Sequence, residues 1–143
     1  MRLRLIALFA VIAVAVPAVA LASRSGTLKF EAYLSGKSEL PKAAAKGKGT
    51  VKITITGTKV CWKFTGIGGI DKPLVSHIHK GTSTVSGPPV VVPLGGKFSA
   101  TGCIAAPAAT AQAIAKNPKG YYVNVHTAKY PNGAIRGQLH AGD

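Results

Sequence analysis

Acidic side chains are scarce in this sequence, which has four Asp and Glu residues against 18 Lys and Arg among 143 residues. Glu31, Glu39 and Asp71 lie far apart along the chain, so a carboxylate pair for glycosidic or other acid–base chemistry is not encoded locally. A Gly-x-Ser-x-Gly elbow and a phosphate-binding glycine loop are also missing. These absences leave enzymatic activity undecided and favour a protein that is not an enzyme.

Positive charge is correspondingly in excess. The formal charge is +14, and it becomes +12 if Arg2 and Arg4 are removed with a leader peptide. Such a charge attracts anionic polymers, lipid headgroups or nucleic acid over long range without choosing among them. The interleaved basic and aromatic pattern of a base-stacking surface is missing, so we expect no specific nucleic-acid partner. A simple alternative is that the lysines only form a solvated surface.

A long apolar run occurs at the N-terminus. A basic stretch at residues 1–4 precedes the apolar residues 5–16, and Ala20-Leu21-Ala22 fits the small-x-small cleavage rule. The pattern predicts a signal peptide over residues 1–22, cleaved after Ala22, and therefore a secreted or extracytoplasmic protein. The alternative is an uncleaved anchor, but spanning a membrane takes about 20 apolar residues and Pro17 interrupts the run. We expect no transmembrane segment after cleavage.

The remaining residues, 23–143, suit a single domain whose core can hold the fold without depending on disulfides. They contain two cysteines, Cys61 and Cys103, whose spacing is not that of a zinc site. An exported chain meets an oxidising compartment, so we expect a structural disulfide between them. Two free buried thiols are the alternative.

Short runs of alternating apolar and polar residues, separated by turn residues, predict an all-β sandwich. One alanine-rich stretch, residues 105–116, has apolar residues near helical spacing and is followed by Pro118, which predicts one short helix. The predicted strands cover residues 28–35, 50–56, 59–65, 74–80, 90–92, 97–104, 121–127 and 134–139. Residues 37–49 are expected to form a basic loop.

The last two predicted strands form a hairpin, because Asn132-Gly133 is a dipeptide that tolerates the positive φ of a tight turn. These otherwise apolar strands also carry the polar residues Asn124, Arg136 and Gln138. We expect the three to form a polar cluster beside the core.

Three histidines are candidate metal ligands. His77 and His79 are two residues apart on a predicted strand, so both rings project from one face. If the strand carrying His126 lies beside them, three nitrogens converge, which suits copper or zinc with an open coordination position. Alternatively, the histidines are buried polar groups that bond to the backbone, Asn124 or Gln138. His140, near the C-terminus, is not expected to be a ligand.

Several motifs occur along residues 28–139: Leu34-Ser35-Gly36 with Glu39 and Pro41, Gly47 to Thr56, His77 to Gly81, Gly87 to Val91, Tyr122 to Thr127, and Ile135 to Leu139. In these motifs the chain resembles the CHRD family, the module repeated in chordin. The chain departs from the family at the two cysteines and at Ala134, where a glutamate is usual. Since chordin is an extracellular antagonist of growth factors, the resemblance implies protein binding outside the cell.

The chain is more distantly similar to copper–zinc superoxide dismutase. This similarity implies an immunoglobulin-like Greek-key β-sandwich with His77, His79 and His126 as copper ligands and Arg136 as an anion-guiding group. The acidic zinc loop of that family is missing here. We therefore expect a secreted, non-catalytic CHRD module that binds an extracellular protein or anionic polymer. The alternative is a mononuclear copper or zinc protein with dismutase-like redox activity.

Overall fold

A computed structural model describes residues 26–143, except residues 86 and 88. The predicted signal peptide lies outside the described residues. Within them the chain forms one nine-stranded antiparallel sheet, in the order β5-β4-β7-β8-β1-β2-β3-β6, with β9 paired to β1. The strands are β1 (Leu28–Ser35), β2 (Lys48–Thr56), β3 (Lys59–Gly68), β4 (Pro73–Lys80), β5 (Val90–Pro93), β6 (Thr101–Ala105), β7 (Tyr121–Thr127), β8 (Ile135–Gln138) and β9 (His140–Ala141).

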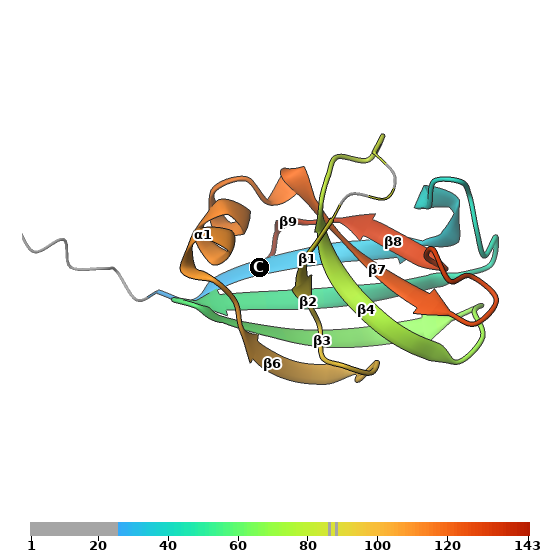
Figure 1. Ribbon diagram of the computed structural model, residues 1–143, viewed down its shortest axis with the longest axis horizontal. Helices are drawn as coiled ribbons and strands as arrows, with labels where there is room; N and C mark the ends of the chain where they lie inside the picture. The colour runs from blue at the N-terminus through green and yellow to red at the C-terminus, as the bar shows by residue number, and fades with distance from the viewer. Residues whose placement is uncertain (1–25, 86, 88) are drawn as a thin grey trace, which may run out of the picture.

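The sheet curls so that its two halves face each other. Figure 1 shows β4 and β7 crossing in front of β1, β2 and β3, and apolar side chains from both halves fill the space between them. The largest fully buried side chains include Ile53, Ile78, Leu94, Ile114, Ile135 and Leu139. This arrangement confirms the predicted all-β sandwich.

Alternation along the strands explains which side chains enter this core. On β1, Phe30, Ala32 and Leu34 are buried while the residues between them are exposed or half-buried. Val51, Ile53 and Ile55 of β2 follow the same period. Because successive strand residues point to opposite faces, the lysines and threonines between these apolar residues are left on the outer face.

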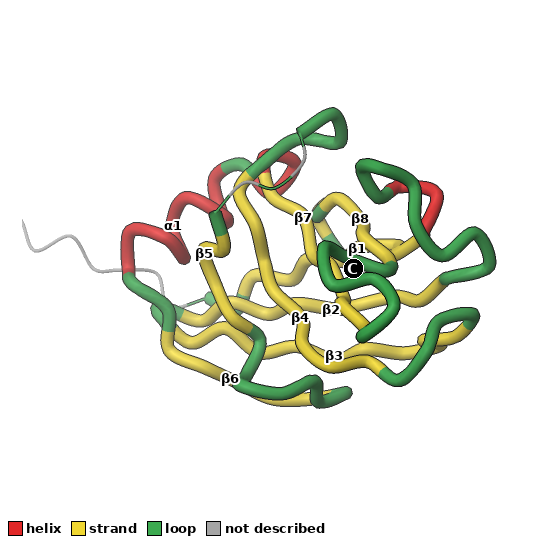
Figure 2. The backbone as a smooth tube through the Cα atoms, turned by 45° about the vertical axis from the view of Figure 1, so that its right-hand side comes forward, coloured by secondary structure: helices red, strands yellow, loops and turns green. Residues whose placement is uncertain are grey.

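Helix α1 (Ala108–Lys116) is the single α-helix among the described residues, as predicted. It buries Ala111 and Ile114 against the core. Figure 2 shows α1 and the 3₁₀ turn η2 (Pro118–Gly120) following one another between β6 and β7. In the described part of the chain, no helix is long and apolar enough to span a membrane.

The predicted disulfide is present. Cys61 on β3 lies directly opposite Cys103 on β6, with the Cα atoms 4.0 Å apart, and the two sulfur atoms are bonded. Both residues are on the outer face, so the bond ties the last strand of this half to its neighbour without entering the core. A disulfide fits an extracellular protein, where thiols are oxidised.

Two segments differ from their predictions. The strand predicted from residue 97 begins at Thr101, because residues 97–100 cross between the two halves: the Phe98 amide donates to Leu74, and the Ala100 carbonyl accepts from Phe64. The predicted loop after β1 starts with a 3₁₀ turn, η1 (Gly36–Ser38), and its end is hydrogen-bonded back to Gly36.

Candidate metal centre

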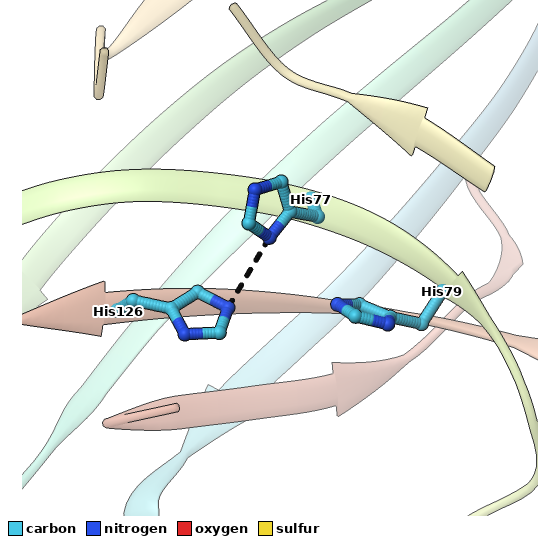
Figure 3. Close-up of side chains that lie close together, drawn as sticks. All are labelled: His77, His79 and His126. Atoms are coloured by element: carbon cyan, nitrogen blue, oxygen red, sulfur yellow. Dashed lines mark hydrogen bonds between the residues drawn. The ribbon is translucent and has the colours of Figure 1, made fainter. Parts of the chain in front are cut away.

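The histidines come together through the pairing of β4 with β7. The register sets His77 opposite Asn124 and Val75 opposite His126, so His126 is the diagonal neighbour of His77. His79 lies opposite Tyr122 on the same pair of strands. Figure 3 shows the three imidazole rings on one face of these strands, with His126 turned toward His77.

This histidine cluster is compact. Nδ1 of His77 is 3.2 Å from Nε2 of His126, and one ring nitrogen from each of the three histidines lies within 4.8 Å of the others. His79 is 7% exposed, while His77 and His126 are half-buried. The cluster therefore lies at the surface of the sheet with one side open to an entering ion.

A backbone carbonyl orients His126. Its Nδ1 lies 2.8 Å from the Pro131 carbonyl oxygen in the β7–β8 turn. Since a carbonyl oxygen only accepts, Nδ1 carries the proton and donates it, so in the neutral ring Nε2 holds the lone pair and accepts a hydrogen bond from Nδ1–H of His77. This is the arrangement by which ligating histidines are commonly held in one tautomer and one orientation.

His77 is held in its neutral form. Burial, followed by the proximity of His126 and then His79, lowers the pKa of His77 from 6.5 to about 4. With this low pKa the ring stays neutral at neutral pH. A neutral imidazole has the lone pair that a metal ion needs, so His77 remains available as a ligand.

The donor atoms fit a small transition-metal ion. Two nitrogens bound tetrahedrally at 2.0–2.1 Å are separated by about 3.3 Å, and His77 and His126 already stand 3.2 Å apart. A third nitrogen within 4.8 Å needs a shift of roughly 1–1.5 Å to join them. Three imidazole nitrogens with an open position match the ligand preferences of zinc and copper.

Tyr122 supports the cluster, a role that the sequence analysis did not predict. Its ring stacks on His79, with centroids 5.0 Å apart and planes 5° apart. The guanidinium carbon of Arg136 lies 3.5 Å from the centroid of the same ring. Because β7 lies between β4 and β8, the ring separates His79 from Arg136 and keeps His79 at a fixed angle. The signal in the sequence was the even spacing of Tyr122, Asn124 and His126.

The predicted polar residues share the outer face of β7 and β8 with the histidines. Arg136 is 2% exposed and donates from its two Nη atoms to the carbonyls of Val85, at 2.8 Å, and Thr82, at 3.0 Å. Nε2 of Gln138 lies 2.6–2.8 Å from the carbonyl oxygens of Gly81, Lys119 and Tyr121. Asn124 is 2% exposed between His77 and Arg136 in the register.

These contacts assign Arg136 and Gln138 a structural role. Both fasten the loop after β4 over the polar face, and their donors are directed at backbone carbonyls. The guanidinium is buried and directed at two carbonyls, so this geometry lends no support to the anion-guiding role implied by the dismutase similarity.

A carboxyl group that follows β1, the strand paired with β8, lies near Arg136. Glu39, in the loop after η1, is 4% exposed and lies against Gly133 in the β7–β8 turn. It therefore brings a carboxyl near the position where Ala134 lacks one. Burial raises the pKa of Glu39 from 4.5 to about 7, although Arg136 and the Leu40 amide act in the opposite direction.

Glu39 is expected to make the folding free energy pH-dependent. Below pH 4.5 the carboxyl is protonated in both states, so it imposes no cost. As the pH rises from 4.5 through about 7, the unfolded chain loses this proton before the folded protein does, and stability falls. The Glu39→Gln variant, measured by urea unfolding, should lose this slope and be more stable than the wild type by about 1–2 kcal/mol at pH 8.

Glu31→Gln removes the same charge from the outer face of β1 and is the matched control. Parallel pH profiles for the wild type and the Glu39→Gln variant between pH 4.5 and 8 would contradict the assignment.

The fold and its site define a disulfide-linked antiparallel β-sandwich with a polar, histidine-bearing outer face. The chain belongs to the CHRD domain family, whose model matches residues 30–139. No match was found among curated proteins or among solved structures. Family membership and the disulfide indicate a non-enzymatic module of the extracellular type.

Proposed function

We propose that this protein is an exported, non-catalytic CHRD module that binds one zinc or copper ion through His77, His79 and His126. The observation that carries the proposal is the approach of three imidazole nitrogens to within 4.8 Å of one another. The low pKa of His77 and the Pro131 carbonyl behind His126 support it, since the first keeps the His77 ring neutral and the second leaves the lone pair of His126 on Nε2, facing His77. Export is supported by the N-terminal pattern and the disulfide.

The ligands come from two neighbouring strands. Nε2 of His126 and Nδ1 of His77 would hold the ion between β7 and β4, in place of the proton that His77 donates to His126, and His79 would complete the set after a small movement. An ion bound in this way supplies a Lewis-acidic centre with an open position for water or another ligand. The protein keeps His126 in one tautomer and positions His79 against Tyr122, so little order has to be created on binding.

Metal analysis tests this proposal. Full-length mature protein, purified without a tag or chelator, is incubated with Zn²⁺ or Cu²⁺, dialysed and analysed by mass spectrometry for metal content. We expect about one equivalent per chain, lost in the His77→Ala variant. His140→Ala is the matched control, because His140 stacks on Tyr33 of β1, away from the cluster. Wild-type protein that retains less than about a tenth of an equivalent would overturn the proposal.

A second role, binding of an anionic extracellular polymer, is favoured by a separate observation. The outer face of β1, β2 and β3 carries five lysines, Lys29, Lys48, Lys52, Lys59 and Lys63, together with Glu31. Asp143 lies beside Lys29 and Lys52. A face with an excess of positive charge attracts polyanions, and it gives a polymer ligand more support than a protein partner.

A further inference from the structure

We propose that the outer face of β1, β2, β3 and β6 binds a linear acidic polysaccharide, a polyuronate, along rows of lysine and threonine that end at Tyr33. The inference rests on the second proposed role and assigns its surface and ligand class. We call this surface the lysine–threonine face. Its residues are Lys29, Glu31, Tyr33, Lys48, Thr50, Lys52, Thr54, Lys59, Lys63, Thr65 and Thr101.

The register aligns these side chains into rows across the strands. One row is Glu31, Lys52, Lys63 and Thr101, and the next toward the β1 C-terminus is Tyr33, Thr50 and Thr65. Neighbouring strands lie about 4.8 Å apart, and alternate residues along a strand about 6.6–6.8 Å apart. Ammonium and hydroxyl groups therefore repeat across the face at about the length of one sugar unit.

One pair of lysines on this face is unfavourable for the stability of the sheet. Lys52 and Lys63 are directly opposite each other, and like charges at such positions destabilise a sheet. Glu31 lies opposite Lys52 on its other side, so it is Lys63 that has no acidic residue directly opposite it. A ligand with one carboxylate on each unit would relieve this repulsion, because its charges could lie between neighbouring ammonium groups.

An exposed aromatic ring distinguishes a sugar polymer from a simple polyanion. Tyr33 is 65% exposed, and its ring stacks with His140 of β9, with centroids 5.3 Å apart and planes 28° apart. A supported flat ring with one free face packs well against the apolar C–H face of a pyranose, and its hydroxyl can bond to the sugar. The adjacent Thr50 and Thr65 offer hydroxyls that both donate and accept.

The face is also rigid and separate from the histidines. The Cys61–Cys103 bond, which lies on this same face, links β3 to β6, so little conformational entropy is lost when a polymer lies across the strands. The histidine cluster is on β4 and β7, in the other half of the curled sheet. Polymer binding and metal binding can therefore be measured independently.

The test uses full-length mature protein with polygalacturonate, measured by calorimetry at low salt in the presence of EDTA. Lys52→Gln/Lys63→Gln should weaken binding about tenfold. Lys97→Gln/Lys116→Gln removes the same charge elsewhere and should change it less than about threefold. Tyr33→Ala should weaken polygalacturonate binding about tenfold, and should leave binding of inorganic polyphosphate unchanged.

The outcomes separate the surface from the role. Equal losses in the two double-lysine variants would overturn the surface assignment while leaving polymer binding in place. No binding of polygalacturonate by the wild type would overturn both, with the metal analysis unaffected. Tighter binding of polyphosphate or double-stranded DNA than of polygalacturonate, without dependence on Tyr33, would identify a phosphate polymer as the ligand and overturn the polyuronate.

Discussion

Replacement of His126 by alanine is expected to weaken zinc and copper binding at least about 100-fold. The His126 ring supplies Nε2, which already lies 3.2 Å from Nδ1 of His77. The hydrogen bond from Nδ1 of His126 to the Pro131 carbonyl keeps the lone pair of His126 on Nε2. Removal leaves two ligands on one strand, so an ion would no longer bridge β4 and β7. Competition titration with a chromophoric chelator at pH 7.5 measures the change in dissociation constant.

His140→Ala provides the comparison for His126→Ala, because it removes an imidazole that is remote from the cluster. Thermal melts without metal show whether each variant is folded. If folded His126→Ala binds within about threefold of the wild type, the ion is held elsewhere and the proposed centre is wrong.

Loss of the disulfide is expected to cost about 3–4 kcal/mol of unfolding free energy. The bond closes a loop over a sequence separation of 42 residues, which restricts the unfolded chain. Both cysteines point to the outer face, so Cys61→Ser/Cys103→Ser places hydroxyls near solvent and leaves the core intact. Chemical unfolding of the double variant should show this loss, with a melting temperature lower by roughly 10–20 °C.

Reduced wild-type protein serves as the reference for the double serine variant, because it lacks the cross-link but keeps the side-chain volume. The two should unfold at nearly the same denaturant concentration. If the unfolding free energies of the oxidised wild type and the variant differ by less than about 1 kcal/mol, the expectation is wrong. Residual pairing of β3 with β6 would then already restrain the unfolded chain without the disulfide.

Period-two alternation made most of the strands predictable. On β1 and β2 the buried residues recur at every second position, and a sheet with one face on the core admits few other registers. The hairpin of β7 and β8 was predictable for a further local reason, the glycine of its Asn-Gly dipeptide. In the structure Gly133 adopts a φ of +129° in this turn. These features depend on residues close together in sequence.

Residues 97–100 show where this reasoning fails. Their composition suits a strand, but they connect β5 to β6 across the two halves of the sheet, and the backbone hydrogen bonds of Phe98 and Ala100 go to β4 and β3, respectively. A connection between two layers depends on how the layers stack, which local pattern does not report.

The candidate site divides in the same way. His77 and His79 were predictable as neighbours, because two residues on a strand share a face. The diagonal placement of His126 required the pairing of β4 with β7, whose segments are separated by some 40 residues. Glu39 near Arg136 was missed entirely, because a loop at the other end of the chain brings it there.

By itself, the order of residues in this chain determined the class of fold, the short helix, the cross-linked cysteines and the family. Each of these follows from periodicity, from turn dipeptides or from motifs read along the chain. Tertiary structure decided which face is lined by lysine, which ring supports His79 and which nitrogens meet. Those outcomes depend on strand order and register, which are set by the packing of the two halves around one core.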